Sequence, residues 1–377
     1  MAVNRILVLG GYGNFGKRIV ESLSSLQGVT LLVGGRSLAR AEALCNRLDA
    51  GGVRSSLKPV EIDIKSSAFV AGLDGLSPDL VIHTGGPFQG QDYTVPRACI
   101  DVGCHYIDLA DDRRFVCDIN SLHQRALEKG VLIVSGASSV PGLSSTVIDE
   151  LSQQFSFLEK IDFAIAPGNR AERGAATVRG ILSYTGHAFP VFINGRWQEV
   201  YGWMSARRLN FGSVIGKRWL ANVDIPDLEL FPERYKPVKT VLFQAGLELP
   251  ILHWGMVFMA ALAKVGLIRD WSNWTAPIVT ASEWFRGFGT DIGGMQINLL
   301  GTDSNQQRKS IKWTLTAEHG IGPYIPTLSA IILSKKFIAG TIDKCGAFPC
   351  LGLYSLDEFD QEALGLGIRH QTETSVG

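Results

Sequence analysis

The sequence has no excess of charge of either sign. Its 377 residues contain 36 Lys and Arg and 36 Asp and Glu, so the formal net charge is zero. Nucleic-acid binding needs a positive face, and we therefore expect no nucleic-acid partner. The six cysteines include no C-x-x-C pair, which is typical of small buried residues in a reducing compartment. The seven histidines are scattered, and their spacing predicts no metal site.

Long apolar runs are also scarce. The first apolar run leads into a glycine-rich turn, so we interpret it as a strand and not as a signal peptide. One other run, Leu249 to Ile268, is almost long enough to cross a bilayer, but His253 and Lys264 interrupt it. We expect a helix that lines an inter-domain cleft or a dimer seam and does not span a membrane, and we leave peripheral membrane contact open. These features predict a cytoplasmic homodimer.

The chain is rich in glycine, and the most informative glycines stand near its beginning. An apolar run, Ile6 to Leu9, leads directly into Gly11-Tyr12-Gly13-Asn14-Phe15-Gly16, and an amphipathic pattern follows. This is G-x-G-x-x-G between a strand and a helix, the setting that binds the pyrophosphate of a dinucleotide. We expect Gly11 to permit a tight turn, Gly13 to let the backbone approach the phosphates, and Gly16 to let the helix lie close to the strand.

No acidic residue follows the second predicted strand, Val29 to Val33. The sequence there reads Gly34-Gly35-Arg36-Ser37-Leu38-Ala39-Arg40. An NAD site usually places Asp or Glu at this point to bind the ribose 2′-hydroxyl, whereas an arginine can hold a 2′-phosphate. Arg36 and Arg40 could instead be solvated surface charges, but together with the missing acid they favour NADP(H) as the cofactor.

The alternation of strands and helices divides the chain. Up to residue 142 it predicts an α/β Rossmann domain with a doubly wound parallel sheet. From 143 to 322 longer alternating strands predict a second, α+β domain on an open mixed sheet. Residues 323–377 predict a C-terminal helix, near Pro326 to Ala339, and a tail that returns to the Rossmann domain. We expect Gln371 to Gly377 to be disordered.

Several segments resemble the saccharopine dehydrogenase (saccharopine reductase) superfamily, especially its bacterial saccharopine dehydrogenase-like oxidoreductases. The resemblance is dense over about the first 145 residues and looser afterwards. It rests on the glycine loop, Gly35-Arg36-Ser37 and three longer segments: GGPFQ (Gly85 to Gln89), ACIDVGCHYIDLADD (Ala98 to Asp112) and SGASSVPGLSS (Ser135 to Ser145). It implies an NADP-binding Rossmann domain, an inserted α+β domain, a catalytic cleft between them, and hydride transfer to or from a carbon–nitrogen bond.

Two departures from that family pattern concern the substrate. Ser144-Ser145 stands where saccharopine reductases carry an Asp-His pair, and Phe88 stands where a tyrosine often follows the proline. A site that hydrogen-bonds its substrate strongly rejects ligands that lack the partner group. The departures therefore predict a small organic substrate other than saccharopine, with a C=N, C=O or C=C group. The tryptophans after Gly195 fit either a more apolar ligand or a core and dimer interface.

Ligands of doubly wound sheets bind at the carboxyl ends of the strands, and the candidate residues follow from that rule. Asp111, beside Asp112, is the leading acid/base candidate, although the pair could instead cap the next helix. His319 is a second proton-donor candidate or a structural residue. The cofactor candidates are Gly11, Gly13, Asn14, Phe15, Gly16, Arg36, Ser37, Arg40, Asp63, Thr84, Gly85, Gly86 and Pro87. The substrate candidates are Phe88, Asp108, Ser144, Arg170 and Arg173, of which the arginines could also be solvated loop residues.

Together these features predict an NADP-dependent oxidoreductase. The alternative is a non-catalytic module that senses NADPH or acts as a scaffold, since a Rossmann fold alone does not establish turnover.

Overall fold

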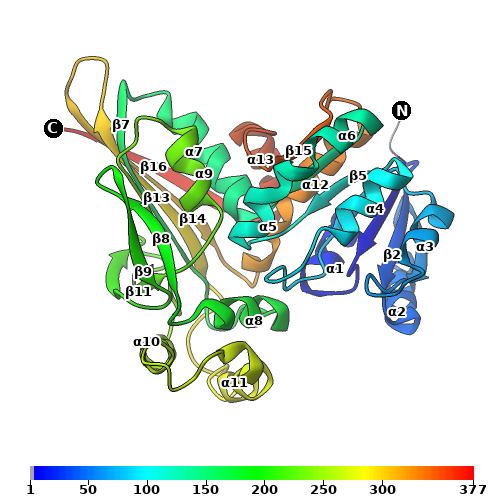
Figure 1. The fold of residues 1–377 in the computed structure, drawn as a ribbon, viewed down its shortest axis with the longest axis horizontal. Helices are drawn as coiled ribbons and strands as arrows, with labels where there is room; N and C mark the ends of the chain where they lie inside the picture. Colours follow the sequence, from blue (N-terminus) through cyan, green and yellow to red (C-terminus); the bar gives the residue numbers. More distant parts are fainter. Residues whose placement is uncertain (1–3) are drawn as a thin grey trace. The chain divides into compact units, whose positions relative to one another are not determined.

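The computed structural model describes residues 4–377, which divide into two compact units (Figure 1). The first comprises residues 4–146 and Tyr324–Phe359, and the second comprises Val147–Pro323 and Asp360–Gly377. The predicted limits 1–142, 143–322 and 323–377 stay predictions, and residues 1–3 of the first range lie outside the described residues.

A seven-stranded parallel sheet forms the centre of the first unit. Its order is β15-β6-β5-β4-β1-β2-β3, and every neighbouring pair is parallel. The strands are β1 (Arg5–Leu9), β2 (Thr30–Gly35), β3 (Ser56–Glu61), β4 (Leu80–His83), β5 (His105–Asp108), β6 (Leu132–Ser135) and β15 (Gly346–Pro349). The order reverses between β1 and β4, and ligands of such sheets bind outside the carboxyl ends at that point.

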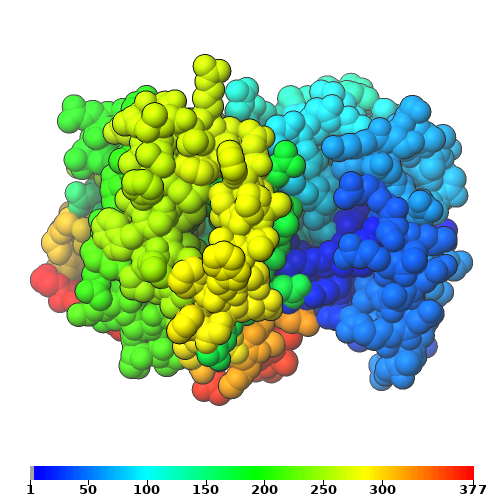
Figure 2. Space-filling view, turned by 90° about the horizontal axis from the view of Figure 1, so that it is seen from below, coloured from blue at the N-terminus to red at the C-terminus, as the bar shows by residue number. Residues whose placement is uncertain are grey.

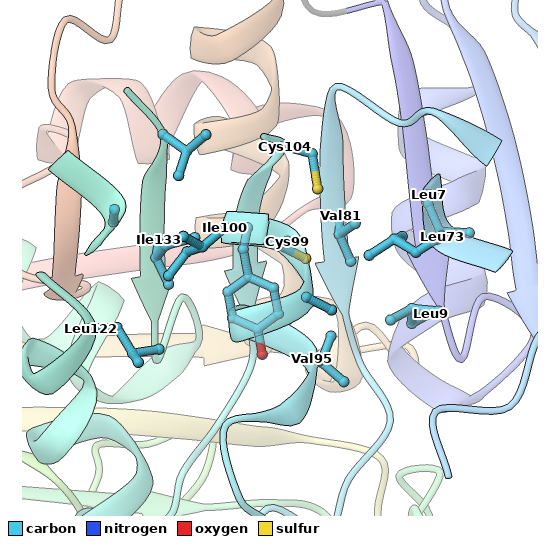
Figure 3. Packing of buried hydrophobic residues seen from close by; sticks show 14 of the residues in the cluster. Leu7, Leu9, Leu73, Val81, Val95, Cys99, Ile100, Cys104, Leu122 and Ile133 are labelled. Carbon is cyan, nitrogen blue, oxygen red and sulfur yellow. The ribbon is translucent and has the colours of Figure 1, made fainter. Parts of the chain in front are cut away.

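Helices pack on this sheet because the strands are apolar on both faces. The larger ones are α1 (Asn14–Leu23), α2 (Leu38–Asp49), α3 (Phe69–Leu76), α4 (Thr94–Val102), α6 (His123–Lys129) and α12 (Ile325–Ile338). Figure 3 shows part of the core, where Leu7, Val81 and Ile133 of three strands meet Val95 and Cys99 of α4. The helix predicted near Pro326 to Ala339 is confirmed as α12, and nearly all of its apolar side chains are buried.

The second unit contains a mixed sheet of order β10-β11-β12-β7-β13-β14-β16. Only β12 and β7 pair in parallel; the other neighbours are antiparallel. The strands are β7 (Phe157–Ala166), β10 (Arg207–Asn210), β11 (Lys217–Asn222), β12 (Thr240–Ala245), β13 (Gly293–Thr302), β14 (Arg308–Ala317) and β16 (Arg369–Val376). The predicted fold class, a Rossmann sheet with a second α+β domain on a mixed sheet, is confirmed.

Smaller elements complete the two units. A hairpin, β8 (Ala188–Ile193) and β9 (Arg196–Tyr201), lies outside the large sheet of the second unit. The helices of this unit include α8 (Ala175–Tyr184), α9 (Asp227–Arg234), α10 (Pro250–Lys264), η3 (Trp271–Trp274) and α11 (Thr275–Glu283), while α7 (Ser144–Ser152) and α13 (Leu356–Ala363) cross between the units. Within residues 4–377 no helix combines the length and the apolar character that crossing a bilayer requires.

Three local expectations are wrong. The third strand was expected at Val60 to Ile64, but β3 covers Ser56–Glu61 and is half exposed, because an edge strand has a weak burial pattern. A continuous helix expected from Phe115 to Lys129 is broken into α5 (Arg113–Cys117), η1 (Asp118–Leu122) and α6.

The chain's last strand is the third difference. Gln371 to Gly377 were expected to be disordered, yet β16 pairs with β14 along its whole length in the second unit, whereas the preceding segment Tyr324–Phe359 belongs to the first unit. The hydrogen-bonding groups on the outer edge of β14 need a partner, and the tail provides it.

Candidate nucleotide-binding and catalytic site

The glycine loop connects β1 to α1 by a tight turn. The left-handed residue of this turn is Gly10, with φ 77°, and a Cβ on Gly11 would lie 2.9 Å from the Val8 carbonyl oxygen. The N–H groups of Gly10 and Gly11 both donate to the Gly34 carbonyl, at 2.9 and 3.0 Å, which ties the loop to the end of β2. A Cβ on Gly16 would lie 2.1 Å from the Gly10 carbonyl oxygen, so only glycine permits the predicted close approach.

The first turn of α1 faces the same end of the sheet. Its N-cap is Gly13, which has no side-chain cap, and the first turn contains no acidic residue. A helix leaves its first N–H groups without intrahelical partners and carries a partial positive charge there. Asn14, Phe15 and Gly16 stand in this first turn, where they are positioned to offer backbone donors to a phosphate.

The end of β2 carries the basic residues predicted for the 2′-phosphate. Ser37 is the N-cap of α2, and its hydroxyl accepts from the Arg40 N–H. The Arg40 guanidinium lies over the Tyr12 ring, 4.6 Å from the centroid. The Tyr12 hydroxyl accepts from the Ser37 N–H at 2.9 Å, and its ring packs so closely on Gly35 that a Cβ there would lie 2.5 Å from it.

Arg36 differs from Arg40 in having no aromatic ring beneath its guanidinium among the described residues. It is exposed, and among residues 4–377 its side chain has no ion pair or hydrogen bond. Asp63, also a predicted cofactor residue, accepts from the Lys65 N–H at 3.0 Å in the turn after β3. The tertiary structure therefore places an unpaired cation, an oriented cation and a capping serine together at the end of β2.

The segment after β4 is tied to the glycine loop. The Thr84 hydroxyl donates to the carbonyls of Leu9 and Gly10, at 2.9 and 3.2 Å. The Gln91 amide donates to the carbonyls of Gly85 and Pro87. Thr84, Gly85, Gly86 and Pro87 thus form an ordered strip beside the glycine loop, and their contact with a nicotinamide ribose stays a prediction.

A buried polar network lies beneath that strip. Asp108, fully buried at the end of β5, accepts from the Ser135 hydroxyl and the N–H groups of Gly136 and Ala110 at 2.8–3.0 Å. Burial raises the Asp108 pKa to about 6, although these hydrogen bonds and the Tyr106 hydroxyl oppose the shift. Asp108 therefore has a structural role, because its carboxylate joins the end of β5 to the end of β6.

His83 belongs to the same network. Its Nδ1 lies 3.1 Å from the Tyr106 hydroxyl, while its Nε2 has no hydrogen-bond partner among the described residues. Burial lowers the His83 pKa to about 4, so the imidazole is neutral near neutral pH.

Asp111 and Asp112 have different roles. Asp112 is the N-cap of α5 and accepts from the Phe115 N–H at 2.8 Å, so the capping interpretation holds for this residue. Asp111 is partly buried and accepts from the Gln89 amide at 3.2 Å. Desolvation is the main reason that its pKa is raised, with the Gln89 hydrogen bond opposing and the Asp112 charge adding to the shift. Unlike Asp112, Asp111 caps no helix of the described chain.

Two predicted substrate residues lie in the interior. Phe88 is 4% exposed, and its ring packs on those of His83 and Phe115 at 5.1 and 5.2 Å. Ser144 is fully buried, and its hydroxyl donates to the Pro141 carbonyl at 3.2 Å. Their positions give both side chains a packing role in the first unit.

The remaining predicted residues belong to the second unit. His319 is exposed, with φ 57°, in the turn after β14. Arg170 donates to the Gly287 carbonyl and Arg173 to the Asn169 carbonyl, so both arginines support the loop in which they stand. The buried carboxylate of this loop region is Glu248, which accepts from Asn169, Arg218 and Thr290.

Sequence reasoning missed Tyr12, Gln89, His83 and Tyr106. An aromatic residue inside the glycine motif was the available signal for Tyr12, and the Gln at the end of GGPFQ was the signal for Gln89. The buried pair His83 and Tyr106 could not be recognised, because they become neighbours only when β4 and β5 pair. Among the described residues no group of His, Cys, Asp and Glu could hold a metal ion.

Comparison with known proteins gives one family match and two structural similarities. Residues 6–134 match the family model described as saccharopine dehydrogenase NADP binding domain. The chain is also similar to apo saccharopine dehydrogenase (L-Glu forming) from Saccharomyces cerevisiae, with a TM-score of 0.68 and 14% identity over 99% of this chain and 100% of that one. A looser similarity, with a TM-score of 0.49 and 9% identity, joins 92% of this chain to 94% of an amine dehydrogenase from Mycobacterium smegmatis. No curated protein matches the chain.

These findings bear on two predictions. The yeast structure confirms the fold over both units, and the family match confirms NADP(H) as the cofactor of the first unit.

Proposed function

We propose that the chain transfers a hydride between NADP(H) and a C=N or C=O group of a small organic molecule other than saccharopine. The match of residues 6–134 to the saccharopine dehydrogenase NADP binding domain and the fold shared with yeast saccharopine dehydrogenase support this proposal. The observation that carries this proposal is the arrangement at the ends of β1, β2 and β4. There the glycine loop, the Ser37–Arg40 cap over Tyr12, and the Thr84–Pro87 strip meet without an acidic residue at the end of β2.

Each part of this arrangement has a chemical task. The first turn of α1 binds the pyrophosphate through backbone N–H groups. Arg36, Ser37 and Arg40 bind the 2′-phosphate, because an arginine fork makes charge-assisted hydrogen bonds to phosphate oxygens. The ordered glycines 85 and 86 leave room for the nicotinamide ribose. When bound, NADPH supplies the hydride.

Asp111 supplies the proton in the reductive direction. A carboxyl group whose pKa is raised stays partly protonated closer to neutral pH, where it can donate to the nitrogen or oxygen that receives the hydride at its carbon. Gln89 orients the Asp111 carboxyl by donating to Oδ1. Because Gln89 directly follows the Thr84–Phe88 segment, the carboxyl is held next to the strip assigned to the nicotinamide ribose.

The experiment that tests this function works while the substrate is still unidentified. NADPH deuterated at either C4 position is incubated with the protein and a metabolite extract, and mass spectrometry detects the compound that gains deuterium. We expect transfer by the native protein and loss of transfer in Asp111→Asn, with NADPH affinity unchanged. The matched control is Asp118→Asn, because the Asp118 side chain is 59% exposed.

The outcome also separates the two function classes. Tight NADPH binding with no deuterium transfer from either face, in extracts that support transfer by a known reductase, would favour the non-catalytic module. Loss of NADPH binding in Asp111→Asn would remove the assignment of a proton-transfer role to this carboxyl.

A further inference from the structure

The second unit exposes an unusual concentration of large apolar side chains. Fifteen such residues are exposed in the described chain, and eight of them fall between residues 251 and 288. We call these eight the α10–α11 patch: Ile251, Trp254, Phe258, Val265, Leu267, Trp274, Trp284 and Phe288, which are 45–78% exposed. Figure 2 looks onto the surface formed by this part of the chain, coloured yellow-green to yellow. Scattered apolar residues are ordinary on a surface, but eight of them concentrated on neighbouring elements indicate an interaction site. The Trp271 indole N–H donates to the Met259 carbonyl at 2.8 Å and so ties η3 to α10, and α11 directly follows η3.

The helix α10 exposes large apolar side chains to solvent, which is unusual for a helix that only completes a domain. Its buried residues are His253, Ala260 and Ala263, and the chain at Gly186 approaches so closely that a Cβ there would lie 2.4 Å from the Ala260 carbonyl oxygen. Its larger residues Ile251, Trp254 and Phe258 face solvent instead. A helix packed on its own domain buries its large apolar residues. Met256 packs with the buried residues on the inner side, so α10 already has an apolar face towards its own unit. Its second apolar face therefore indicates that the outer side binds something else.

The charge around the α10–α11 patch indicates which kind of partner could bind it. The cations around the patch include Lys264 and Arg269 at the end of α10 and Arg179 on α8, and none of the three has an ion pair among residues 4–377. Two acidic groups lie in the same segment, and only Asp270 keeps a negative charge that no ion pair of the described chain balances, against the three cations. Asp270 caps η3 through Ser272, and Glu283 pairs with Arg286 at 3.0 Å. In a chain of zero net charge, this surface is locally positive.

We propose that the α10–α11 patch docks on an anionic lipid bilayer surface, without crossing it. Trp and Phe on one face, with Lys and Arg beside them, are the side chains that insert at the boundary between headgroups and acyl chains. The neighbouring cations attract anionic headgroups. A second copy of the chain is a less suitable occupant, since a two-fold interface pairs a surface with itself and would bring six cations together with only the two Asp270 carboxylates to oppose them.

The aromatic part of the proposal is tested by flotation of the full-length protein with vesicles. One set contains phosphatidylcholine alone, and the other adds phosphatidylglycerol as a minor component. We expect binding to the anionic set only, with the tryptophan emission shifted to the blue. The double variant Trp284→Ser/Phe288→Ser removes two exposed apolar side chains and should weaken binding by at least about tenfold. Trp197→Ser, a 49% exposed tryptophan on β9, is the matched control and should bind normally.

The electrostatic part has its own variant. Lys264→Gln/Arg269→Gln should weaken binding to anionic vesicles by about tenfold or more, and high salt should weaken binding of the native protein. The control Arg54→Gln/Lys58→Gln changes two charges of the first unit and should have no effect. Unfolding midpoints equal to that of the native protein show that the variants fold.

Three results would overturn the proposal. They are absence of flotation with either vesicle set, equal loss of binding in Trp197→Ser, and a native dimer in sedimentation velocity that becomes a monomer in Trp284→Ser/Phe288→Ser. The last result would identify a second copy as the occupant. None of these measurements depends on hydride transfer or NADPH binding, so the proposed function and this docking surface succeed or fail separately.

Discussion

Arg40 lies with its guanidinium over the ring of Tyr12, 4.6 Å from the centroid, and the Tyr12 hydroxyl accepts from the N–H of Ser37. One aromatic residue inside the glycine motif thus orients both the cation and the capping serine at the end of β2. The Tyr12 side chain therefore makes direct contacts between the proposed pyrophosphate end and the proposed 2′-phosphate end of the site.

The first prediction concerns Tyr12 itself. Tyr12→Phe keeps the ring under Arg40 and removes one hydrogen bond, worth about 1 kcal/mol, so NADPH affinity should fall about fivefold. Tyr12→Ala also removes the cation–π contact, worth about 0.5–1 kcal/mol at an exposed site, and should have the larger effect. Isothermal titration calorimetry measures both, and NADH affinity should change little. Equal losses for the two nucleotides would contradict a role at the 2′-phosphate.

The second prediction concerns Arg36. The native protein should bind NADPH more tightly than NADH, and Arg36→Ala should lose about 1.5–3 kcal/mol of NADPH binding, as expected for a hydrogen bond to a charged group. The control Arg54→Ala removes an exposed arginine near the start of β3, at the other end of the strands. Equal calorimetric affinities of the native protein for the two nucleotides would remove the basis for NADP(H) selectivity.

The third prediction concerns the glycine loop. Gly16→Ala would place a methyl group 2.1 Å from the Gly10 carbonyl oxygen. Because the obstacle is backbone, the variant should lose about 1–3 kcal/mol of stability and bind NADPH poorly. Gly72→Ala, within α3 and with no atom within 4 Å of the added Cβ, should be neutral or stabilising by up to about 1 kcal/mol. Urea denaturation compares the two, and similar stabilities would contradict the close approach.

The fourth prediction is a pH dependence of stability. Asp108 has a folded-state pKa of about 6, above its unfolded value of about 3.9. Its contribution to the free energy of unfolding therefore falls by up to about 3 kcal/mol as the pH rises from about 4 to 6. His83 has a folded-state pKa of about 4, below its unfolded value of about 6.5. Its contribution therefore changes in the opposite direction, and is lost as pH falls from about 6.5 to 4.

In Asp108→Asn the pH dependence of stability that His83 causes should no longer be offset by Asp108. The asparagine oxygen can accept the three hydrogen bonds that Asp108 Oδ1 receives, while no charge develops. The free energy of unfolding of the variant, relative to that of the native protein, should therefore increase as the pH rises from about 4 to 6. Urea unfolding at a series of pH values measures this difference, and parallel curves for the two proteins would contradict the assignment of the raised pKa to Asp108.

The fifth prediction is a negative result with saccharopine. Phe88 and Ser144 have apolar or already bonded side chains, so they provide no free polar group for an amino-acid end of that substrate. NADP⁺ reduction by saccharopine should stay at background in a spectrophotometric assay. Robust turnover that is lost in Gly16→Ala would show that saccharopine is bound by other residues.

The nucleotide-binding half of the protein was predictable to a large extent. The apolar run before Gly11, the glycine spacing and the missing acid after Val33 are local signals, and each has a local physical cause. The parallel sheet and the fold class followed from the same alternation. Where strand burial is weak, as at β3, the predicted strand lies several residues from the observed one, because hydrophobic periodicity is visible only when one face of the strand is buried.

The candidate site was predictable only in part. Asp111 and Asp112 are adjacent and equivalent in the sequence, and only the course of the backbone assigns the cap to Asp112 and the Gln89 contact to Asp111. The position of Ser144, where the resembled family carries a polar pair, suggested a ligand contact, whereas packing buries its hydroxyl against the Pro141 carbonyl. Residue type indicates what a group can do, but burial and neighbours determine its pKa and its access.

Local sequence therefore determined the Rossmann unit, its nucleotide motif and its preference for a phosphorylated ribose, since these depend on backbone geometry and charge over short distances. Tertiary structure alone decided which residues meet: Arg40 over Tyr12, β16 against β14, and the outward-facing Trp254 and Phe258 of α10. The physical reason is that side-chain contacts and edge pairing join residues far apart in the chain. Hydrophobic pattern alone also does not say which apolar face of a helix the protein itself will cover.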